Sequence, residues 1–519
     1  MILKKTLLLF LSLVLAPPEG NAAPAFPSLD ADGGAAYHGR RAAAEEAGRG
    51  WRDLAAAALW ASSVNAGPGA EEKAAAYMER IAAAAAELAG AADLPPDPRG
   101  RGEFVLGFLH RRFLKSYSEY QTRVDEIFVS GRYNCVSSAA LYMILGRSVG
   151  LKVQGVMTRD HAFVTVDAGT GSAGPGSGPE IIDVETTNPY GFDPGNRKEF
   201  HDAFGKTTGF AYVPAKNYRD RAVLSGPELA SLILSNRAAV LERGSRFAEA
   251  VPLAINRAAF LNAAAGVNAA GASAAGEDRA FFEGPRRDVM SRIFNLGSYF
   301  IRTGKEDDAL DWEEYASPRF ADPERWQELV NAAANNKLVK LIRAKKTACA
   351  RAALGVLRPR LNDANYRALD YLVLDAEAAD RVNGIKNPGD AEAALAFLAS
   401  GGSRLSAARL EELRTAAVLA EADRYGRVRD WTGGMAWLAS ALERYENSGQ
   451  QSARRIEGAL RTFRQNRISE LHNQFALLFN RKDYEGARAA VQKALEEFPG
   501  ERQLAQDLAL VEKTLGRTP

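Results

Sequence analysis

The sequence predicts an α+β core that is preceded by helices and followed by a long all-α region of stacked helical hairpins. Three features along the 519 residues predict this order. Ala, Glu and Arg dominate residues 35–93, a composition that favours helix. Residues 151–215 change to strand-like runs separated by Gly-rich turns and prolines. After Ser225-Gly226-Pro227 the helical pattern returns and continues to the end.

The first 23 residues have the composition of an export signal. Lys4 and Lys5 give a positive start, residues 7–16 form an apolar run, and Ala22-Ala23 suits a signal-peptidase site. The run is too short to cross a bilayer of roughly 30 Å as a helix, and an uncleaved anchor is the alternative. We therefore expect a periplasmic or secreted protein. The expected regions are a signal peptide (1–23), an Ala-rich helical region (24–104), the α+β core (105–225) and the repeat region (226–519).

Composition and charge narrow the classes of function. The 66 Lys and Arg residues are balanced by 64 Asp and Glu residues, so no basic surface for nucleic acid is expected. The only cysteines, Cys135 and Cys349, lie in segments typical of different domains, and we expect two separate thiols rather than a disulfide. Neither a metal site nor an organic cofactor is predicted. A zinc site made of Cys135, His161 and Asp183 is a minor alternative.

The last region carries an internal repeat. Trp326 and Leu329 recur 33 residues after Ile293 and Leu296. Residues 482–499 match the second half of the same pattern, whereas residues 335–460 show only helical patterning. The pattern resembles the tetratricopeptide repeat, which implies a stacked solenoid that binds a protein partner, and an irregular helical bundle is the alternative. The best-matched stretch places large, small and aromatic residues at the repeat's positions through Ile293, Leu296, Gly297, Phe300, Gly304 and Ala309.

Cys135 is the candidate nucleophile. It opens the apolar stretch 136–149, which has the pattern of a buried helix. The first turn of a helix has unsatisfied backbone N–H groups and the positive end of the helix dipole, and both favour an anion. An adjacent imidazolium would add to this effect and activate the thiol. A small buried core residue is the alternative interpretation.

His161 is the candidate base, because it alone among the five histidines begins a strand-like run. The next strand-like run carries Asp183 and Glu185 on one face, after a turn rich in Gly, Ser and Pro. A hairpin centred near residue 172 would place His161 opposite Asp183. We expect Asp183 to orient the imidazole, with Glu185 as the main alternative and Asn188 as a weaker one.

The order of these elements resembles the transglutaminase-like core of the papain-like cysteine hydrolase superfamily. The matching residues are Cys135 at the start of a buried helix, the strand beginning His161-Ala162-Phe163, and Asp183 with Thr186 shortly after it. The resemblance covers residues 105–215. It implies a Cys-His-Asp triad that forms an acyl-enzyme on the amide bonds of a protein or peptide, with hydrolysis favoured over cross-linking.

Several residues near this set are candidates for substrate binding. The backbone N–H of Cys135 is the expected first donor to an oxyanion, and Tyr133, Asn134 or Gln121 is expected to supply a second. Tyr190 and Phe192 lie in a turn-rich segment that could form a wall of the cleft. The alternative function is a catalytically inactive module that serves, together with the repeats, as a protein-binding scaffold.

Overall fold

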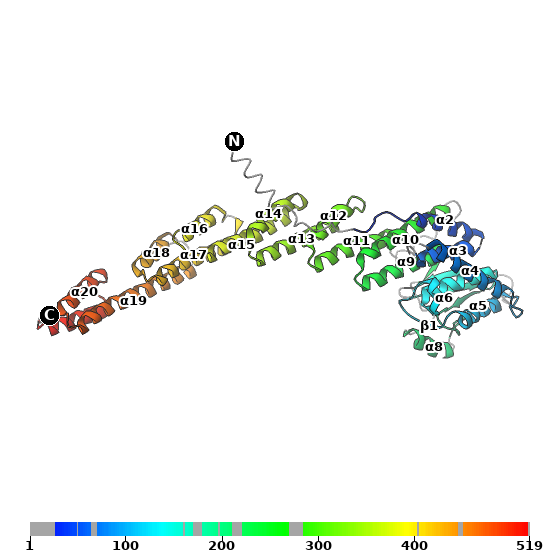
Figure 1. The fold of residues 1–519 in the computed structure, drawn as a ribbon, viewed down its shortest axis with the longest axis horizontal. Helices are drawn as coiled ribbons and strands as arrows, with labels where there is room; N and C mark the ends of the chain where they lie inside the picture. The colour runs from blue at the N-terminus through cyan, green and yellow to red at the C-terminus, as the bar shows by residue number, and fades with distance from the viewer. Residues whose placement is uncertain are drawn as a thin grey trace, which may run out of the picture. The chain divides into compact units, whose positions relative to one another are not determined.

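The computed structural model describes residues 26–48, 50–63, 70–158, 161–169, 179–195, 198–209, 221–268, 284–401, 404–444 and 450–516. The predicted signal peptide and most of the predicted hairpin turn lie outside these residues. The chain forms two compact units, residues 1–329 and 330–519. The first unit contains the small sheets, and the second is helical in its described residues (Figure 1).

The N-terminal part of the first unit is helical, as predicted. Asp97 caps one of its helices by accepting a hydrogen bond from the backbone N–H of Gly100, and Pro98 occupies the first helical position. The helices are α2 (Gly33–Gly48), α3 (Arg52–Ser63), α4 (Ala70–Ala89), α5 (Pro98–Arg112) and α6 (Val124–Ser130).

The predicted strands form an antiparallel sheet in the order β5-β4-β3-β6. Alternate residues of β4 and β5, including Val164 and Val184, are buried in the main hydrophobic core. Two shorter strands, β1 (Ser116–Tyr117) and β2 (Arg132–Tyr133), pair in parallel just before Cys135. The strands of the larger sheet are β3 (Lys152–Met157), β4 (Ala162–Asp167), β5 (Ile181–Val184) and β6 (Ala222–Leu224).

Helix α7 (Cys135–Ser148) is the central element of this core. Its residues from Val136 to Arg147 are all buried, which agrees with the apolar pattern seen in the sequence. The buried Arg147 guanidinium donates to the carbonyl of Val153 at 3.0 Å. Ile144 and Leu145 are fully buried in the same core as β4. This helix therefore provides a rigid mount for Cys135 at its first position.

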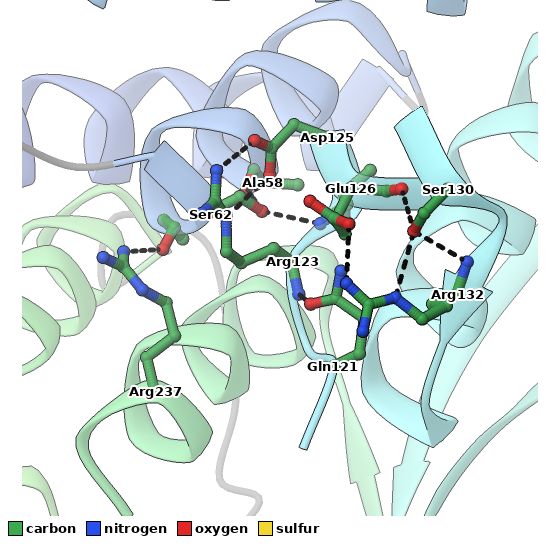
Figure 2. Close-up of polar contacts among 11 residues, drawn as sticks. Ala58, Ser62, Gln121, Arg123, Asp125, Glu126, Ser130, Arg132 and Arg237 are labelled. Atoms are coloured by element: carbon green, nitrogen blue, oxygen red, sulfur yellow. Dashed lines mark hydrogen bonds and ion pairs between the residues drawn. The ribbon is translucent and has the colours of Figure 1, made fainter. Parts of the chain in front are cut away.

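Helix α9 (Gly226–Arg243) belongs to the same core, so the predicted boundary after residue 225 passes through packed structure. Leu229 and Ile233 are buried together with residues of α7. One turn further along the same face of α9, Arg237 donates to the carbonyl of Ala61 at the end of α3 (Figure 2). Burial and the nearby Arg123 charge lower the pKa of Arg237 to about 10, so it stays charged at neutral pH.

A serine joins α3 to α6 at the same place. The Ser62 hydroxyl donates to the carbonyl of Ala58 at 2.7 Å and accepts from the backbone N–H of Val124 at 2.8 Å (Figure 2). This backbone N–H is the first of α6 and has no partner inside its own helix. The N-terminal helices, the α+β core and α9 thus share buried polar contacts.

Paired helices follow α9 in the first unit, which agrees with the helical pattern of the sequence. A Cβ at Gly297 would overlap the Leu329 side chain, which explains the small residue at this position. Gly304 has φ +74° in the turn that follows, a conformation that favours glycine. The elements are α10 (Phe247–Asn268), α11 (Pro285–Arg302), α12 (Glu306–Ala316) and the start of α13 (Pro323–Arg343).

The second unit continues in helices, including the stretch 335–460 where the sequence period fades. Three turns there share a left-handed residue, namely Lys345, Arg429 and Lys482 with φ of 59°, 58° and 65°. Cys349 is exposed. The elements are α14 (Thr347–Leu357), η3 (Arg358–Arg360), α15 (Asp363–Asn383), α16 (Asp390–Gly401), α17 (Ala407–Arg427), α18 (Trp431–Arg444), α19 (Gln450–Asn480), α20 (Tyr484–Glu497) and α21 (Arg502–Thr514).

None of the helices in the described part of the chain has the length and apolar character needed to cross a bilayer.

Candidate active site

The residues before Cys135 fix it at the start of α7. Gly131 ends α6 in the left-handed conformation with φ +70°, and a Cβ there would overlap the Lys115 side chain. Asn134 then caps α7, since its side-chain oxygen accepts from the backbone N–H of Ser137 at 3.0 Å. The Ser137 hydroxyl donates in turn to the backbone carbonyl of Gln121 at 3.1 Å. The half-buried Cys135 therefore stands at a helix N-terminus, as predicted.

The structure brings Cys135, His161 and Glu185 together. His161 lies directly before β4, and its ring is near enough to the Cys135 side chain for Cys135 to raise its pKa. The His161 Nε2–H donates to Glu185 Oε2 at 2.6 Å. Because Nε2 is engaged by the carboxylate, Nδ1 is the ring nitrogen left for the sulfur. The three groups lie in the order sulfur, imidazole and carboxylate, which is the order of the nucleophile, base and orienting group in known acyl-transfer sites.

Asp183, the expected orienting residue, does not contact His161. Its carboxylate accepts from both terminal nitrogens of Arg221, one of them at 2.9 Å. The hairpin of β4 and β5 forms as predicted, but its register pairs Asp183 with Thr165 rather than with His161. At about 3.3 Å per residue, this places Asp183 roughly 13 Å along the sheet from His161. The predicted face is right and the predicted register is wrong, and Glu185, the stated alternative, makes the bond.

Neighbouring hydrogen bonds hold Glu185 in place. Its Oε1 accepts from the Thr187 hydroxyl at 2.7 Å and from the Thr187 backbone N–H at 3.2 Å. The Glu185 side chain is 2% exposed, so its charge is desolvated and depends on these donors and on His161. A Cβ at Gly191 would overlap the Glu185 carbonyl, which requires glycine where the loop returns to the strand.

The next residue, Thr186, ties this loop to two helices. Its hydroxyl lies 2.8 Å from the Ser138 hydroxyl in the first turn of α7. Its carbonyl accepts from His110 Nε2 in α5 at 3.1 Å. Burial lowers the pKa of His110 to about 4, so this imidazole is neutral and acts as a buttress of the loop. Asn188, the weakest of the three orienting candidates, accepts instead from the backbone N–H of Tyr190.

The electrostatics of the site favour a protonated His161. Burial by itself would lower the pKa of the imidazole. The Glu185 charge, the nearby Cys135 side chain and the hydrogen bond to Glu185 together outweigh burial and raise the His161 pKa well above its ordinary value of 6.5. An imidazolium next to a sulfur at a helix N-terminus is the environment that activates cysteine nucleophiles.

Tyr117 is a site residue that sequence reasoning missed. It pairs with Tyr133 in the parallel β1–β2 ladder, and the two rings lie 6.0 Å apart, edge to face. Burial and then the charges of Cys135 and nearby acidic groups, including Glu185, raise the Tyr117 pKa, so its hydroxyl remains a donor. No pattern in the sequence marks a strand of two residues, and only the parallel pairing brings this residue to the site.

The predicted binding residues mostly have structural roles. Tyr133 is 4% exposed and donates to the Thr187 carbonyl at 3.0 Å. Asn134 is the buried cap of α7, and Phe192 is 2% exposed in the main core. These three are therefore corrected to packing and capping roles. Tyr190 is 57% exposed and stays available to a ligand.

The Gln121 side chain is not placed as the second oxyanion donor for which it was a candidate. Its oxygen accepts from the backbone N–H of Arg123 at 3.2 Å, at the entrance to α6 (Figure 2). Its amide nitrogen is buried and has no hydrogen-bond partner among the described residues. Nothing in the structure directs this group at Cys135.

Helix α8 (Lys198–Thr208) supplies apolar cover to the imidazole. The Phe204 ring meets the His161 ring edge to face at 5.8 Å, and the two ring planes of Phe163 and His161 are stacked at 6.3 Å. The His161 side chain is 13% exposed as a result. Restricted water access strengthens the electrostatic contacts within the site.

Comparisons with known proteins do not identify a family for the chain. No protein-family model matches the chain, and a search of curated proteins found no match.

Proposed function

We propose that the chain is a transglutaminase-like cysteine enzyme that acts on amide bonds of a protein or peptide, through Cys135, His161 and Glu185. The observation that carries this proposal is the 2.6 Å bond from His161 Nε2 to the buried Glu185 carboxylate, with the Cys135 side chain acting on the same ring. A buried carboxylate, an imidazole and a helix-capped sulfur in series constitute the nucleophile, base and orienter of acyl transfer.

The reaction begins with attack of the Cys135 sulfur on the substrate carbonyl carbon. The negative charge that develops on the carbonyl oxygen is met by the backbone N–H of Cys135, which is one of the unsatisfied donors of the first turn of α7. The Tyr117 hydroxyl is the side-chain donor that we propose for the same oxygen. His161 then gives its Nδ1 proton to the leaving amine, and the C–N bond breaks to leave a thioester.

The thioester is resolved by a second nucleophile. A water molecule, or an amine in the cross-linking case, gives its proton to the neutral His161 as it attacks the thioester carbonyl. The C–S bond breaks, and the thiolate and imidazolium are restored. Glu185 holds the ring in one orientation in both halves of the cycle, because its other oxygen is fixed by Thr187. We favour water as the acceptor, with the helical hairpins recruiting protein substrates in the periplasm or outside the cell.

Trapping of the acyl-enzyme tests this function. The full chain is incubated with a mixture of cell-envelope proteins and quenched in acid, and the peptide containing Cys135 is examined by mass spectrometry. Acyl adducts on Cys135 that are absent from the His161→Ala variant are expected. Added glycine amide separates the two acceptors, because transfer produces amide-tagged products and hydrolysis produces free acids. Absence of adducts, with normal folding, would favour the inactive binding module.

A further inference from the structure

An extended segment precedes α2 and lies across the first helical hairpins. Residues 26–32 contain no helix or strand, and Figure 1 shows this dark-blue segment running along α10 to α12. The Phe26 ring lies 5.4 Å from the Trp312 ring, 5.6 Å from Tyr315 and 6.1 Å from Phe300. One aromatic side chain of the segment thus fills a site made by three aromatic side chains of α11 and α12.

Three more contacts continue from this anchor along the segment. Leu29 is 5% exposed, and the Asp30 carboxylate pairs with Arg319 at 2.9 Å. The backbone N–H of Asp32 donates to the Asn256 side-chain oxygen in α10 at 2.7 Å. Pro27, between the anchors, favours an extended backbone. Peptides bind grooves and pockets in a similar way, with an aromatic anchor and a charged pair at the rim.

Asp32, the last residue of the segment, caps helix α2 by accepting from the backbone N–H of Gly34 at 3.0 Å. Helix α2 also has packing contacts outside the segment, because Ala35 and Ala42 are buried against Ala57 and Phe260. Asp30 and Arg319 have side chains that are 79% and 47% exposed, so their ion pair contributes little to stability. Tyr315 remains 40% exposed with the segment in place. The contacts that residues 26–30 make with the hairpin surface are therefore of the kind that a bound peptide makes.

We propose that Phe300, Trp312, Tyr315 and Arg319 form a peptide-docking site, that residues 26–32 occupy it as a tethered ligand, and that a protein partner displaces them with an extended segment in which a carboxylate follows an aromatic residue by four positions. A short tether raises the local concentration of the cis segment to about the millimolar range, so even a weak site is occupied until a partner competes. This inference goes beyond the proposed catalytic function and does not rest on it.

Fluorescence anisotropy of a labelled peptide with the sequence of residues 24–34 tests the proposal on the full chain. We expect weak binding to the wild type and binding at least tenfold tighter to Phe26→Ala, because that substitution weakens the cis competitor. The same peptide carrying Phe26→Ala should not bind. In the Phe26→Ala background, Arg319→Asp should weaken binding several-fold, and a peptide carrying Asp30→Arg should restore it.

A second variant protects the test against loss of folding. Asp30→Arg breaks only the exposed ion pair, so it should retain the wild-type melting temperature and bind the peptide more tightly than the wild type does. If neither variant binds the peptide saturably while both melt like the wild type, residues 26–32 are only a structural strap and the proposal is wrong. Iodoacetamide labelling of Cys135 should be unchanged in both variants, so failure here is distinguishable from failure of the catalytic proposal.

Discussion

Replacing Glu185 with Gln tests which of two carboxylates, Asp183 or Glu185, orients the His161 imidazole. Glu185 Oε2 accepts from His161 Nε2 at 2.6 Å, and the Glu185 side chain is 2% exposed. Unit charges about 4 Å apart interact by about 4 kcal/mol at an effective dielectric constant of 20. Because one pKa unit corresponds to about 1.36 kcal/mol, the charge sets a ceiling of about three units on the change in the His161 pKa.

Gln keeps an oxygen that can accept the same hydrogen bond, so we expect Glu185→Gln to lower the His161 pKa by about two units. The imidazolium that stabilises the Cys135 sulfur is then depleted near neutrality, and labelling of Cys135 by iodoacetamide at pH 6 should fall by about 100-fold. The matched control is Asp183→Asn, because Asp183 pairs with Arg221 and not with His161.

Labelling is followed by mass spectrometry of the peptide containing Cys135, with the exposed Cys349 as an internal reference. The pH dependence of Cys135 labelling should shift in Glu185→Gln and should match the wild type in Asp183→Asn. Equal loss in the two variants, or an unchanged profile in Glu185→Gln, would refute the assignment of Glu185 as the orienting residue.

Three further predictions concern the surroundings of the triad. Gly191→Ala forces a methyl group into the Glu185 carbonyl and should destabilise the fold by about 3 kcal/mol, measured by urea unfolding; an unchanged midpoint would contradict the packing described. Tyr117→Phe should lower kcat by about 10- to 100-fold while the Cys135 labelling rate stays constant, and a parallel loss of labelling would instead indicate a structural role. Burial lowers the pKa of His110 from 6.5 to about 4, so the unfolded state binds more protons between these values and stability falls as pH falls. His110→Gln should abolish this contribution to the pH dependence of the free energy of unfolding, which is up to about 3 kcal/mol between pH 6.5 and 4. If the free energy of unfolding falls with pH equally steeply in the wild type and the variant, this prediction is wrong.

The sequence was sufficient for the local features of the site. The position of Cys135 follows from a polar cap before an apolar run, and the strand that begins directly after His161 follows from its alternation. The parity of Asp183 and Glu185 was also predictable, since side chains alternate along a strand. Each of these features depends on residues close together in the chain.

The hairpin register was not predictable, because the flexible Gly, Ser and Pro residues of the turn do not fix where the pairing begins. Only tertiary contacts, such as the Arg221 pair that holds Asp183, decide which carboxylate meets His161. Tyr117 was missed for a related reason, since its strand has two residues and pairs with β2 across α6.

The boundary of the core also depends on tertiary packing. Helix α9 falls in the region that the sequence assigned to the repeats, yet Leu229 and Ile233 are buried in the core that carries Cys135. A single helix pattern does not indicate which neighbour will cover its apolar face. For this reason residues 105–225 are not expected to keep the site when they are expressed without α9.

The central claim is that Cys135 is held as an activated nucleophile by His161. The pH dependence of Cys135 alkylation in the full-length protein, compared with His161→Ala and referenced to Cys349, measures this most directly. The account predicts alkylation of Cys135 well below pH 7 in the wild type, with that advantage lost in the variant. A wild-type profile that rises only near pH 8.5, together with Cys349 and unaffected by His161→Ala, would contradict it.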